Sequence, residues 1–294
     1  MKSISISGQD LAYWYYQAKK TAIANEIDPE EIDWLVQTIT SLNRLDLRLG
    51  RFSHQREIIS NRSLSELNKL WQQRLHQRLP VQYLAEIVFW RRFQLKVTPA
   101  VLIPRPETEL IIDIAQANHR IKQPQENWVD LGTGSGAIAL GLADIFPQAL
   151  IHAVDLSHDA LNIAKENAHN SKLESNIYFY QGNWWHPLEI FRGQITGMVS
   201  NPPYIPTAQI EKLQPEVANH EPHLALDGGK DGLDSIRYLI ETSSQYLVSG
   251  GMWLVELMVG QAEIVVELLK KEYCDIQVFR DLNGIERFVL AYKI

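Results

Sequence analysis

The chain has 294 residues, of which 45% are hydrophobic and 21% are charged. These fractions are those of an ordinary soluble globular protein, and the length allows one large domain or a domain with a smaller partner. No apolar run is long enough to span a bilayer, and residues 1–5 lack the apolar core of a signal peptide. The single cysteine, Cys274, excludes an intrachain disulfide and a cysteine metal cluster, so we predict a cytoplasmic protein without membrane attachment.

The net charge of −7 is unevenly distributed along the chain. Residues 1–106 contain 15 Lys and Arg against 10 Asp and Glu, whereas residues 107–294 contain 13 against 25. Within residues 44–96, eleven basic side chains stand against four acidic ones. This excess is typical of a solvated helical surface, and it also fits a face that meets an acidic or phosphate-rich partner.

The first 79 residues show helical patterns, beginning with a helix over about residues 9–24. Asp28-Pro29-Glu30-Glu31 combines an N-cap, a proline at the first helical position and acidic residues in the first turn, which predicts a helix start. Ser63 and Glu66 form a capping box, and Pro80 ends the helix that follows. We therefore predict that residues 1–79 form a small helical domain.

Between residues 80 and 103 the pattern changes to short extended segments. Residues 81–84 and 93–97 read as two strands, which predicts a β-hairpin linker between domains. Two prolines then stiffen residues 102–109. Glu107 and Glu109 fall in the first turn of the next predicted helix, where the helix dipole favours negative charge.

From residue 127 onward, strands alternate with helices, which is the pattern of βαβ units and a mainly parallel sheet. We expect helices at residues 137–143, 157–169, 234–247 and 261–271, and strands at residues 128–131, 149–154, 177–180, 195–200, 252–257, 276–279 and 287–292. Asn283-Gly284 is a hairpin signal and makes the last strand antiparallel. Residues 104–294 are therefore predicted to form an α/β domain with a mainly parallel seven-stranded sheet.

A glycine-rich segment, Asp130-Leu131-Gly132-Thr133-Gly134-Ser135-Gly136, lies between the first of these strands and its helix. Glycines let the backbone turn tightly and approach a ligand, and the amides at the following helix N-terminus favour negative charge. The carboxylate of Asp130 suits a ligand with a cationic amino group. Because Ala137 stands where the relaxed dinucleotide fingerprint tolerates alanine, a nicotinamide or flavin ligand stays open at this point.

Polar and aromatic side chains follow the next two strands. Asp155 ends the second strand, where a carboxylate can accept hydrogen bonds from ribose hydroxyls or cap the following helix. Asn183 and Trp184 end the third strand, where an amide and an aromatic plane can hold the edge and the face of an adenine ring. Trp185 fits the protein core better. Together with the glycine segment, these residues outline a nucleoside site at the carboxyl edge of the sheet.

Asn201-Pro202-Pro203-Tyr204 ends the fourth strand and therefore faces the same crevice. The prolines cannot donate to a sheet and hold the segment extended, and a rigid strand exit without chemistry is one interpretation. The other is catalytic: the Asn201 side-chain oxygen and the Pro202 carbonyl can accept both N–H groups of a planar amide or aryl amine. Such acceptors orient the nitrogen toward an electrophile, and Tyr204 can stack on the planar group.

These segments together resemble the HemK/PrmC family of S-adenosylmethionine-dependent protein-(glutamine-N5) methyltransferases. The resemblance spans nearly the whole chain, and it is carried by Pro80-Val81-Gln82-Tyr83, residues 102–109, 130–136, 199–205, Glu221-Pro222, residues 225–229 and Asp231-Gly232-Leu233. Asn-Pro-Pro-Tyr alone is shared with other amino-methyltransferases, including adenine-N6 enzymes. The segments at 102–109 and 227–233 are more specific to the family.

Members of this family, the peptide chain release factor N5-glutamine methyltransferases, modify the Gln of the Gly-Gly-Gln motif in class-1 translation release factors. The resemblance implies a class I, Rossmann-like methyltransferase domain that uses S-adenosylmethionine and releases S-adenosylhomocysteine. It implies that residues 132–136 bind the methionine part, Asp155 the ribose and Trp184 the adenine region. Asn201 would lie between cofactor and substrate, residues 201–204 would hold the target amide, and the helical domain would recognise the release factor.

Three residues depart from the family pattern. Asn183 replaces the usual Asp, and we expect weaker rather than lost cofactor binding because an amide oxygen still accepts from the adenine amino group. Glu86 replaces a glycine in the hairpin region, which questions the shape of that turn. Met258 replaces a glycine after Glu256, and we expect this change to reshape the loop below the sixth strand.

Two other functions stay open. The excess of basic residues within 44–96 leaves an adenine-N6 nucleic-acid methyltransferase as an alternative. Against it, residues 107–294 are acidic overall and no base-reading module is recognisable. Asn183 is the only support for a cofactor-binding scaffold without turnover. We expect a monomer that forms no stable complex with nucleic acid. No His pairs with acidic residues at metal-like spacing on one predicted helix, so we also predict no metal site.

Overall fold

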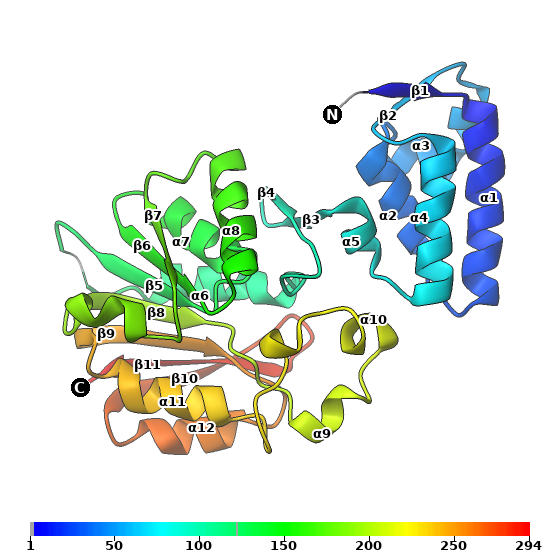
Figure 1. Ribbon diagram of the computed structural model, residues 1–294. Coiled ribbons are helices and arrows are strands. Elements are labelled where there is room, and N and C mark those ends of the chain that lie inside the picture. Colours follow the sequence, from blue (N-terminus) through cyan, green and yellow to red (C-terminus); the bar gives the residue numbers. More distant parts are fainter. Residues whose placement is uncertain (1–2, 122) are drawn as a thin grey trace. The chain divides into compact units, whose positions relative to one another are not determined.

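The computed structural model describes residues 3–121 and 123–294, and the chain divides into two compact units. Unit 1 comprises the described residues up to Ile87 together with Pro215–His220, and unit 2 comprises Val88–Gln214 and Glu221–Ile294. Figure 1 shows unit 1 as a group of helices with a short sheet, and unit 2 as a larger twisted sheet flanked by helices. In the described part of the chain, no helix is long and apolar enough to cross a membrane.

Unit 1 is mainly helical, as the sequence predicts. Its helices are Gly8–Ala24 (α1), Glu30–Ile39 (α2), Arg44–Leu49 (α3), Leu64–Gln77 (α4) and Val81–Ala85 (α5), with a 3₁₀ turn at Arg51–His54 (η1). The capping box of α4 is confirmed, because the Glu66 N–H donates to the Ser63 hydroxyl and the Ser63 N–H donates to the Glu66 carboxylate at 2.7 Å. At the start of α2, the Glu30 N–H donates to Asp28 at 2.9 Å. Apolar side chains of α1, α2 and α4 form the buried core of this unit.

One element within residues 1–84 was not predicted, and one prediction is wrong. The helical unit also contains a small antiparallel sheet of Ile4–Ile6 (β1) and Ile58–Ser60 (β2), since three-residue strands are too short to show an alternating pattern. Residues 81–84, predicted as a strand, belong to helix α5. The Pro80 carbonyl accepts hydrogen bonds from the Tyr83 and Leu84 N–H groups at 3.0 and 3.2 Å, which closes a helical turn.

Segment Pro215–His220 groups with unit 1 because polar side chains fasten it to α4. The buried Arg74 guanidinium donates to Glu31 at 2.6 Å and to Glu216 at 2.8 Å. His220 Nε2 donates to the Gln77 carbonyl at 2.6 Å. Arg74 and Glu216 are 142 positions apart in the sequence, so no local pattern could indicate this attachment.

The expected hairpin exists, but its first strand begins later than predicted. Ile87–Trp90 (β3) and Phe93–Lys96 (β4) pair as a two-stranded sheet. Glu86 precedes β3 as the C-cap of α5 and has a φ of 58°, in the left-handed region that favours glycine. A residue with a side chain pays about 1 kcal/mol for this conformation, which explains why a glycine suits the position.

The sheet of unit 2 has the order β10-β11-β9-β8-β5-β6-β7. Neighbouring strands from β9 to β7 run parallel, and β11 is antiparallel to both of its neighbours, which confirms the predicted seven-stranded sheet with an antiparallel last strand. The strands are Asn127–Leu131 (β5), Leu150–Asp155 (β6), Ile177–Gln181 (β7), Ile195–Ser200 (β8), Leu247–Glu256 (β9), Tyr273–Arg280 (β10) and Glu286–Lys293 (β11).

Helices cover both faces of this sheet (Figure 1). Leu110–Asn118 (α6), Ala137–Ile145 (α7) and His158–Asn170 (α8) lie on one face, and Asp234–Ser243 (α11) and Ala262–Leu269 (α12) lie on the other. The connections add Thr207–Ile210 (α9), Pro215–Ala218 (α10) and 3₁₀ turns at Glu107–Glu109 (η2), His186–Phe191 (η3) and His223–Ala225 (η4). The strand order reverses at β5, between β6 and β8, and such a switch point opens a ligand crevice at the carboxyl ends of the strands.

Candidate active site

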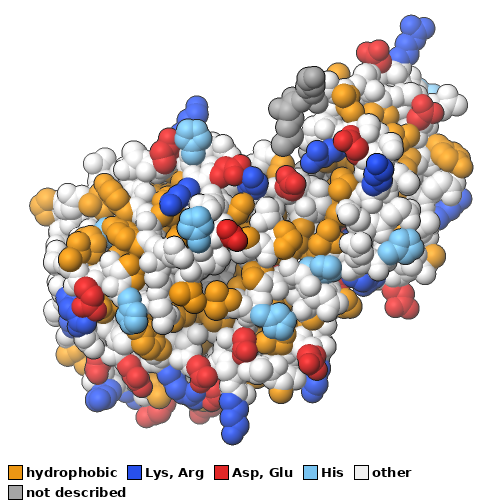
Figure 2. All heavy atoms as spheres, in the orientation of Figure 1, with side chains coloured by type: hydrophobic (Ala, Val, Ile, Leu, Met, Phe, Trp, Pro, Cys, Tyr) orange, Lys and Arg blue, Asp and Glu red, His pale blue; other side chains and the backbone are white. Residues whose placement is uncertain are grey.

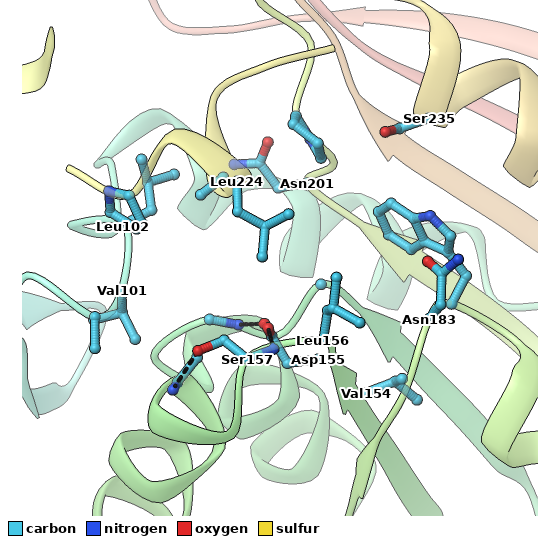
Figure 3. Close-up of a pocket in the computed structure, with 18 of the residues that line it drawn as sticks. Val101, Leu102, Val154, Asp155, Leu156, Ser157, Asn183, Asn201, Leu224 and Ser235 are labelled. Atoms are coloured by element: carbon cyan, nitrogen blue, oxygen red, sulfur yellow. Dashed lines mark hydrogen bonds between the residues drawn. The ribbon is translucent and has the colours of Figure 1, made fainter. Parts of the chain in front are cut away.

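A cavity of about 280 Å³ opens where β5, β6, β7 and β8 end. In Figure 3, Asn201 and Leu224 lie on one side of the hollow, and Asp155 and Ser157 lie on the opposite side. All of the residues that line the cavity belong to unit 2. Seven predicted site residues are among them: Gly132, Gly134, Asp155, Asn183, Trp184, Asn201 and Pro203.

The glycine segment is held in a conformation that requires glycine. Gly132, Gly134 and Gly136 have φ values of 78°, 53° and 83°, all in the left-handed region. A Cβ on Gly134 would meet no atom within 4 Å, so this residue presents bare backbone to open space. Gly136 instead faces α8, where a Cβ would lie 3.1 Å from the Cβ of Ala164. The first two glycines therefore shape the cavity, and the third lets α7 and α8 approach each other.

Asp130 lies beneath the segment rather than on the cavity wall. Its side chain is fully buried, and one carboxylate oxygen accepts from the Thr133 hydroxyl at 2.6 Å and the Ala139 N–H at 3.0 Å. The other oxygen has no hydrogen-bond partner within residues 3–121 and 123–294. Burial raises the pKa of Asp130 to about 7, against the lowering effect of these two hydrogen bonds. Thr133 and Ser135 are also buried and do not line the cavity. The hydrogen bonds of Asp130 with Thr133 and Ala139 hold the loop against the start of α7.

Asp155 joins the glycine segment to the start of α8. Its carboxylate accepts from the Gly134 N–H at 2.8 Å and from the Ser157 N–H at 2.9 Å. Burial raises the pKa of this carboxyl, while the backbone N–H groups oppose that rise. Each carboxylate oxygen retains acceptor capacity on the cavity side, so Asp155 can bind ligand hydroxyls and stabilise the loop at the same time.

Asn183 and Trp184 form another wall. The Asn183 side-chain amide has no hydrogen-bond partner among the described residues, and it faces the cavity in Figure 3. Trp184 has a φ of 51°, and its ring lies 3.5 Å from the position of a Cβ on Gly132. Trp185 is core, as predicted, because its ring is 1% exposed and stacks on Tyr246 with 4.3 Å between ring centroids.

Asn201 directly follows β8 and lines the cavity (Figure 3). The amide NH₂ is directed at the Thr108 hydroxyl, 3.5 Å away. That hydroxyl donates to Glu256 at 2.7 Å, so its lone pairs are available to the Asn201 amide. In this arrangement the Asn201 oxygen is left as an acceptor for a ligand.

The other residues of the Asn-Pro-Pro-Tyr segment are not all at the cavity wall. Pro203 lines it, whereas Pro202 is buried and Tyr204 directs its hydroxyl to Glu256 at 3.2 Å. The Tyr204 phenol has a pKa raised by burial and by the nearby Glu256 carboxylate. Tyr204 is therefore held by its hydroxyl end, and its suggested stacking on a substrate stays a prediction.

Residues 226–233 brace the backbone of the Asn-Pro-Pro-Tyr segment. The Ile205 N–H donates to the Leu226 carbonyl at 3.0 Å, and the Gly228 N–H donates to the Ile205 carbonyl at 2.9 Å. Gly232 lies so close to Tyr204 that a Cβ would sit 2.2 Å from the Tyr204 carbonyl oxygen. The buried Gln261 amide joins both carbonyls, at 3.0 Å to Tyr204 and 3.2 Å to Gly232. Steric closeness therefore accounts for the glycine in Asp231-Gly232-Leu233.

Sequence reasoning missed several residues of the site. The cavity is also lined by Val101, Leu102, Leu224 and Ser235, and the network behind it contains Thr108 and Glu256. Glu256 left one signal, since it is a charged residue that ends a strongly apolar strand. Among residues 3–121 and 123–294, no group of three or more His, Cys, Asp or Glu side chains could hold a metal ion.

A family model described as "Methyltransferase small domain" matches residues 108–228 of the chain. A release factor glutamine methyltransferase from Synechocystis sp. is 55% identical over 97% of this chain and 97% of that protein. A protein of the same name from Thermosynechococcus vestitus is 44% identical over 97% of this chain and 99% of its own length. Both relatives therefore match the chain over both units.

Solved structures share the fold at low sequence identity. The catalytic domain of hMettl16, solved in complex with MAT2A 3′UTR hairpin 6, has a TM-score of 0.55 at 14% identity and covers 87% of this chain and 88% of that one. A methyltransferase from Pyrococcus furiosus has a TM-score of 0.51 at 18% identity, covering 68% and 89%. The fold is thus that of class I, Rossmann-like methyltransferases. Given the identity and coverage of its relatives, the chain belongs to the family of release factor glutamine methyltransferases, which depend on S-adenosylmethionine.

Proposed function

We propose that this protein transfers a methyl group from S-adenosylmethionine to the side-chain amide nitrogen, N5, of the Gln in the Gly-Gly-Gln motif of class-1 release factors. The proposal rests on the identity to release factor glutamine methyltransferases over nearly the whole chain. The structural observation that supports it most is the Asn201 amide at the cavity, with its NH₂ turned to Thr108 and its oxygen left as an acceptor.

The residues around the cavity fit S-adenosylmethionine. Bare backbone at Gly134 leaves room for the methionine part of the cofactor. The Asp130 carboxylate oxygen that has no hydrogen-bond partner among the described residues lies beneath the glycine segment. Asp155 retains acceptors for ribose hydroxyls, and the free Asn183 amide can accept from an adenine amino group. A cavity of about 280 Å³ is just below the usual range of about 300–1,000 Å³ for small-molecule sites.

When bound, S-adenosylmethionine supplies an electrophilic methyl group on a positively charged sulfur. A glutamine amide is a weak nucleophile because its nitrogen lone pair is delocalised. The Asn201 oxygen would accept one of its N–H groups. The carbonyl of Pro202, a residue that is buried in this structure, would accept the other, and the two contacts would fix the nitrogen in line for attack. As the N–C bond forms, the methyl–sulfur bond breaks and its electron pair stays on sulfur. The nitrogen becomes positive, and both acceptors would stabilise it until one proton is lost to water.

A nucleic-acid adenine is the second candidate substrate, because its amino group offers the same two N–H groups. The basic excess within residues 44–96 is the observation in its favour. On the face shown in Figure 2, however, the basic side chains of unit 1 are dispersed among acidic and uncharged ones rather than gathered in a stripe. A backbone-tracking surface needs clustered positive charge, and the described residues on this face show none. We favour the protein substrate because of the identity to release factor glutamine methyltransferases. We further propose a cytoplasmic monomer that requires no metal.

The decisive assay incubates the purified protein with labelled S-adenosylmethionine and, separately, a class-1 release factor and duplex DNA. We expect label on the release factor only, mapped by mass spectrometry to the Gln of Gly-Gly-Gln and lost when that Gln is replaced. Asn201→Ala should abolish the transfer, and a chelator should have no effect. Label on DNA with none on the release factor would refute the proposal. Calorimetric binding of the cofactor without any transfer would indicate a scaffold without turnover.

A further inference from the structure

Glu256 is a buried carboxylate at the end of β9 that joins two parts of the Asn-Pro-Pro-Tyr segment. Its two oxygens accept hydrogen bonds from different side chains, Thr108 at 2.7 Å and Tyr204 at 3.2 Å. Thr108 in turn meets the Asn201 amide. Asn201, Thr108, Glu256 and Tyr204 therefore form one chain of contacts, and only Asn201 lines the cavity. We infer that Glu256 is a positioning residue, which acts through Thr108 to hold the Asn201 oxygen toward the target amide.

The direction of each proton in this chain follows from the carboxylate. An ionised Glu256 can only accept, so Thr108 must use its single proton to donate to it. The Thr108 oxygen then presents lone pairs, which select the NH₂ end of the Asn201 amide. The Asn201 oxygen is thereby turned away from Thr108 and is available to a substrate N–H group. Without the carboxylate, Thr108 could donate to the Asn201 oxygen instead and remove that acceptor.

Tyr204 gives Glu256 a second connection to the same segment. The Tyr204 hydroxyl also has one proton, and an ionised carboxylate fixes it as a donor. Its backbone carbonyl is held separately by Gln261 at 3.0 Å. The segment is therefore anchored on both sides of Pro203, at Asn201 through Thr108 and at Tyr204 through its hydroxyl and its carbonyl.

The surroundings of Glu256 contain few other charges. Its side chain is 2% exposed, and burial raises the pKa of the carboxyl to about 7, opposed by the hydrogen bonds from Thr108 and Tyr204. Arg287 on β11 favours the ionised form, and Glu107 in η2 disfavours it. A buried carboxylate costs free energy that an apolar side chain at this position would avoid. Packing alone therefore gives no reason for a glutamate here, whereas orienting Thr108 and Tyr204 does.

The inference rests on the proposed function and is tested with Thr108→Val and Glu256→Gln in the full chain. We expect each variant to lower kcat about tenfold to a hundredfold, with little change in KM for the release factor. A misplaced acceptor slows the transfer step without weakening substrate binding. The double variant should be little worse than either single one, since both break the same chain of contacts. Thr108→Ser, which keeps the hydroxyl, should retain most of the activity. Full activity of Thr108→Val would overturn the inference.

Thr196→Val is a matched control. Thr196 is 2% exposed on β8, the strand that leads to Asn201, and its hydroxyl has no partner among the described residues. The same chemical change at this position should leave kcat at the wild-type value. A loss equal to that of Thr108→Val would mean that any buried Thr→Val change disturbs the site, and it would overturn the specific role of Thr108.

A second measurement needs no release factor. The side-chain NH₂ signal of Asn201 can be identified in a ¹⁵N-labelled sample by its absence from the Asn201→Ala spectrum. We expect Thr108→Val and Glu256→Gln to shift this signal, and Thr196→Val to leave it in place. An unmoved signal in both variants would overturn the inference even if release factor is methylated. A shifted signal in a protein that methylates no release factor would instead refute the proposed function alone.

Discussion

The two halves of the cavity wall are built in different ways. The glycine segment and Asp155 are joined mainly by backbone groups, with left-handed glycines and N–H donors shaping the wall. The Asn201 side is held by side chains, through Thr108, Glu256 and Tyr204, and by the close approach of Gly232. Changes in the first half should therefore act on cofactor affinity, and changes in the second on the rate of transfer.

Asp155→Ala should produce the largest effect on the first half. It removes two acceptors for backbone N–H groups and the acceptor proposed for the ribose, and each charged hydrogen bond is worth about 1.5–3 kcal/mol. We expect the Kd for S-adenosylhomocysteine, measured by calorimetry, to rise about a hundredfold. At saturating cofactor, kcat should fall much less. Asp159→Ala is the control, because this exposed carboxylate in the first turn of α8 lies outside the cavity lining. Equal losses in both variants would contradict the role of Asp155.

Gly134→Ala and Gly232→Ala form a matched pair across the two halves. Both glycines have a positive φ, so both substitutions carry a similar conformational cost of about 1–2 kcal/mol. A Cβ on Gly232 would press on the Tyr204 carbonyl at 2.2 Å, whereas a Cβ on Gly134 would meet no protein atom and would enter the cavity. We expect kcat to fall about tenfold or more in Gly232→Ala, with the cofactor Kd unchanged. In Gly134→Ala the cofactor Kd should rise instead. If kcat and Kd change in the same way in both variants, the two halves of the wall do not have separate roles.

The sequence predicted the backbone half of the site better than the side-chain half. Glycines at a strand–helix turn and a carboxylate at a strand end are local patterns, and the sheet order brings Gly132, Asp155 and Asn183 to one edge. The Thr108–Glu256 contact joins residues 148 positions apart, and it depends on the packing of η2 against the end of β9. The helix at residues 81–85 and the attachment of Pro215–His220 to unit 1 were missed for the same reason, since neither leaves a periodic signal.

The pH dependence of kcat should report on the Asn201 half alone, and its effect should be smaller than those of the substitutions above. The pKa of Glu256 is raised to about 7, mainly by burial, and only the ionised form compels Thr108 to donate to it. We therefore expect kcat to rise about tenfold between pH 6 and pH 8, as the ionised fraction of such a group increases. The assay needs saturating cofactor, because Asp130 beneath the glycine segment also has a pKa of about 7. Glu256→Gln should give a low kcat that does not change with pH. If kcat of this variant rises with pH as steeply as that of the wild type, another group is responsible for the pH dependence.

Asn183→Asp should have the smallest effect, and it acts on the first half only. The Asn183 amide faces the cavity without a partner, and an aspartate would offer a charged acceptor to an adenine amino group. Charge-assisted hydrogen bonds are roughly twice as strong as neutral ones, so we expect the Kd for S-adenosylhomocysteine to fall about threefold to tenfold. Asn183→Ala should raise it, and kcat at saturating cofactor should be the same in all three proteins. Because the change adds charge near Asp155 as well, a weaker affinity in Asn183→Asp would mean that repulsion between the two carboxylates outweighs the new hydrogen bond. The amide would then be the better residue for this particular wall.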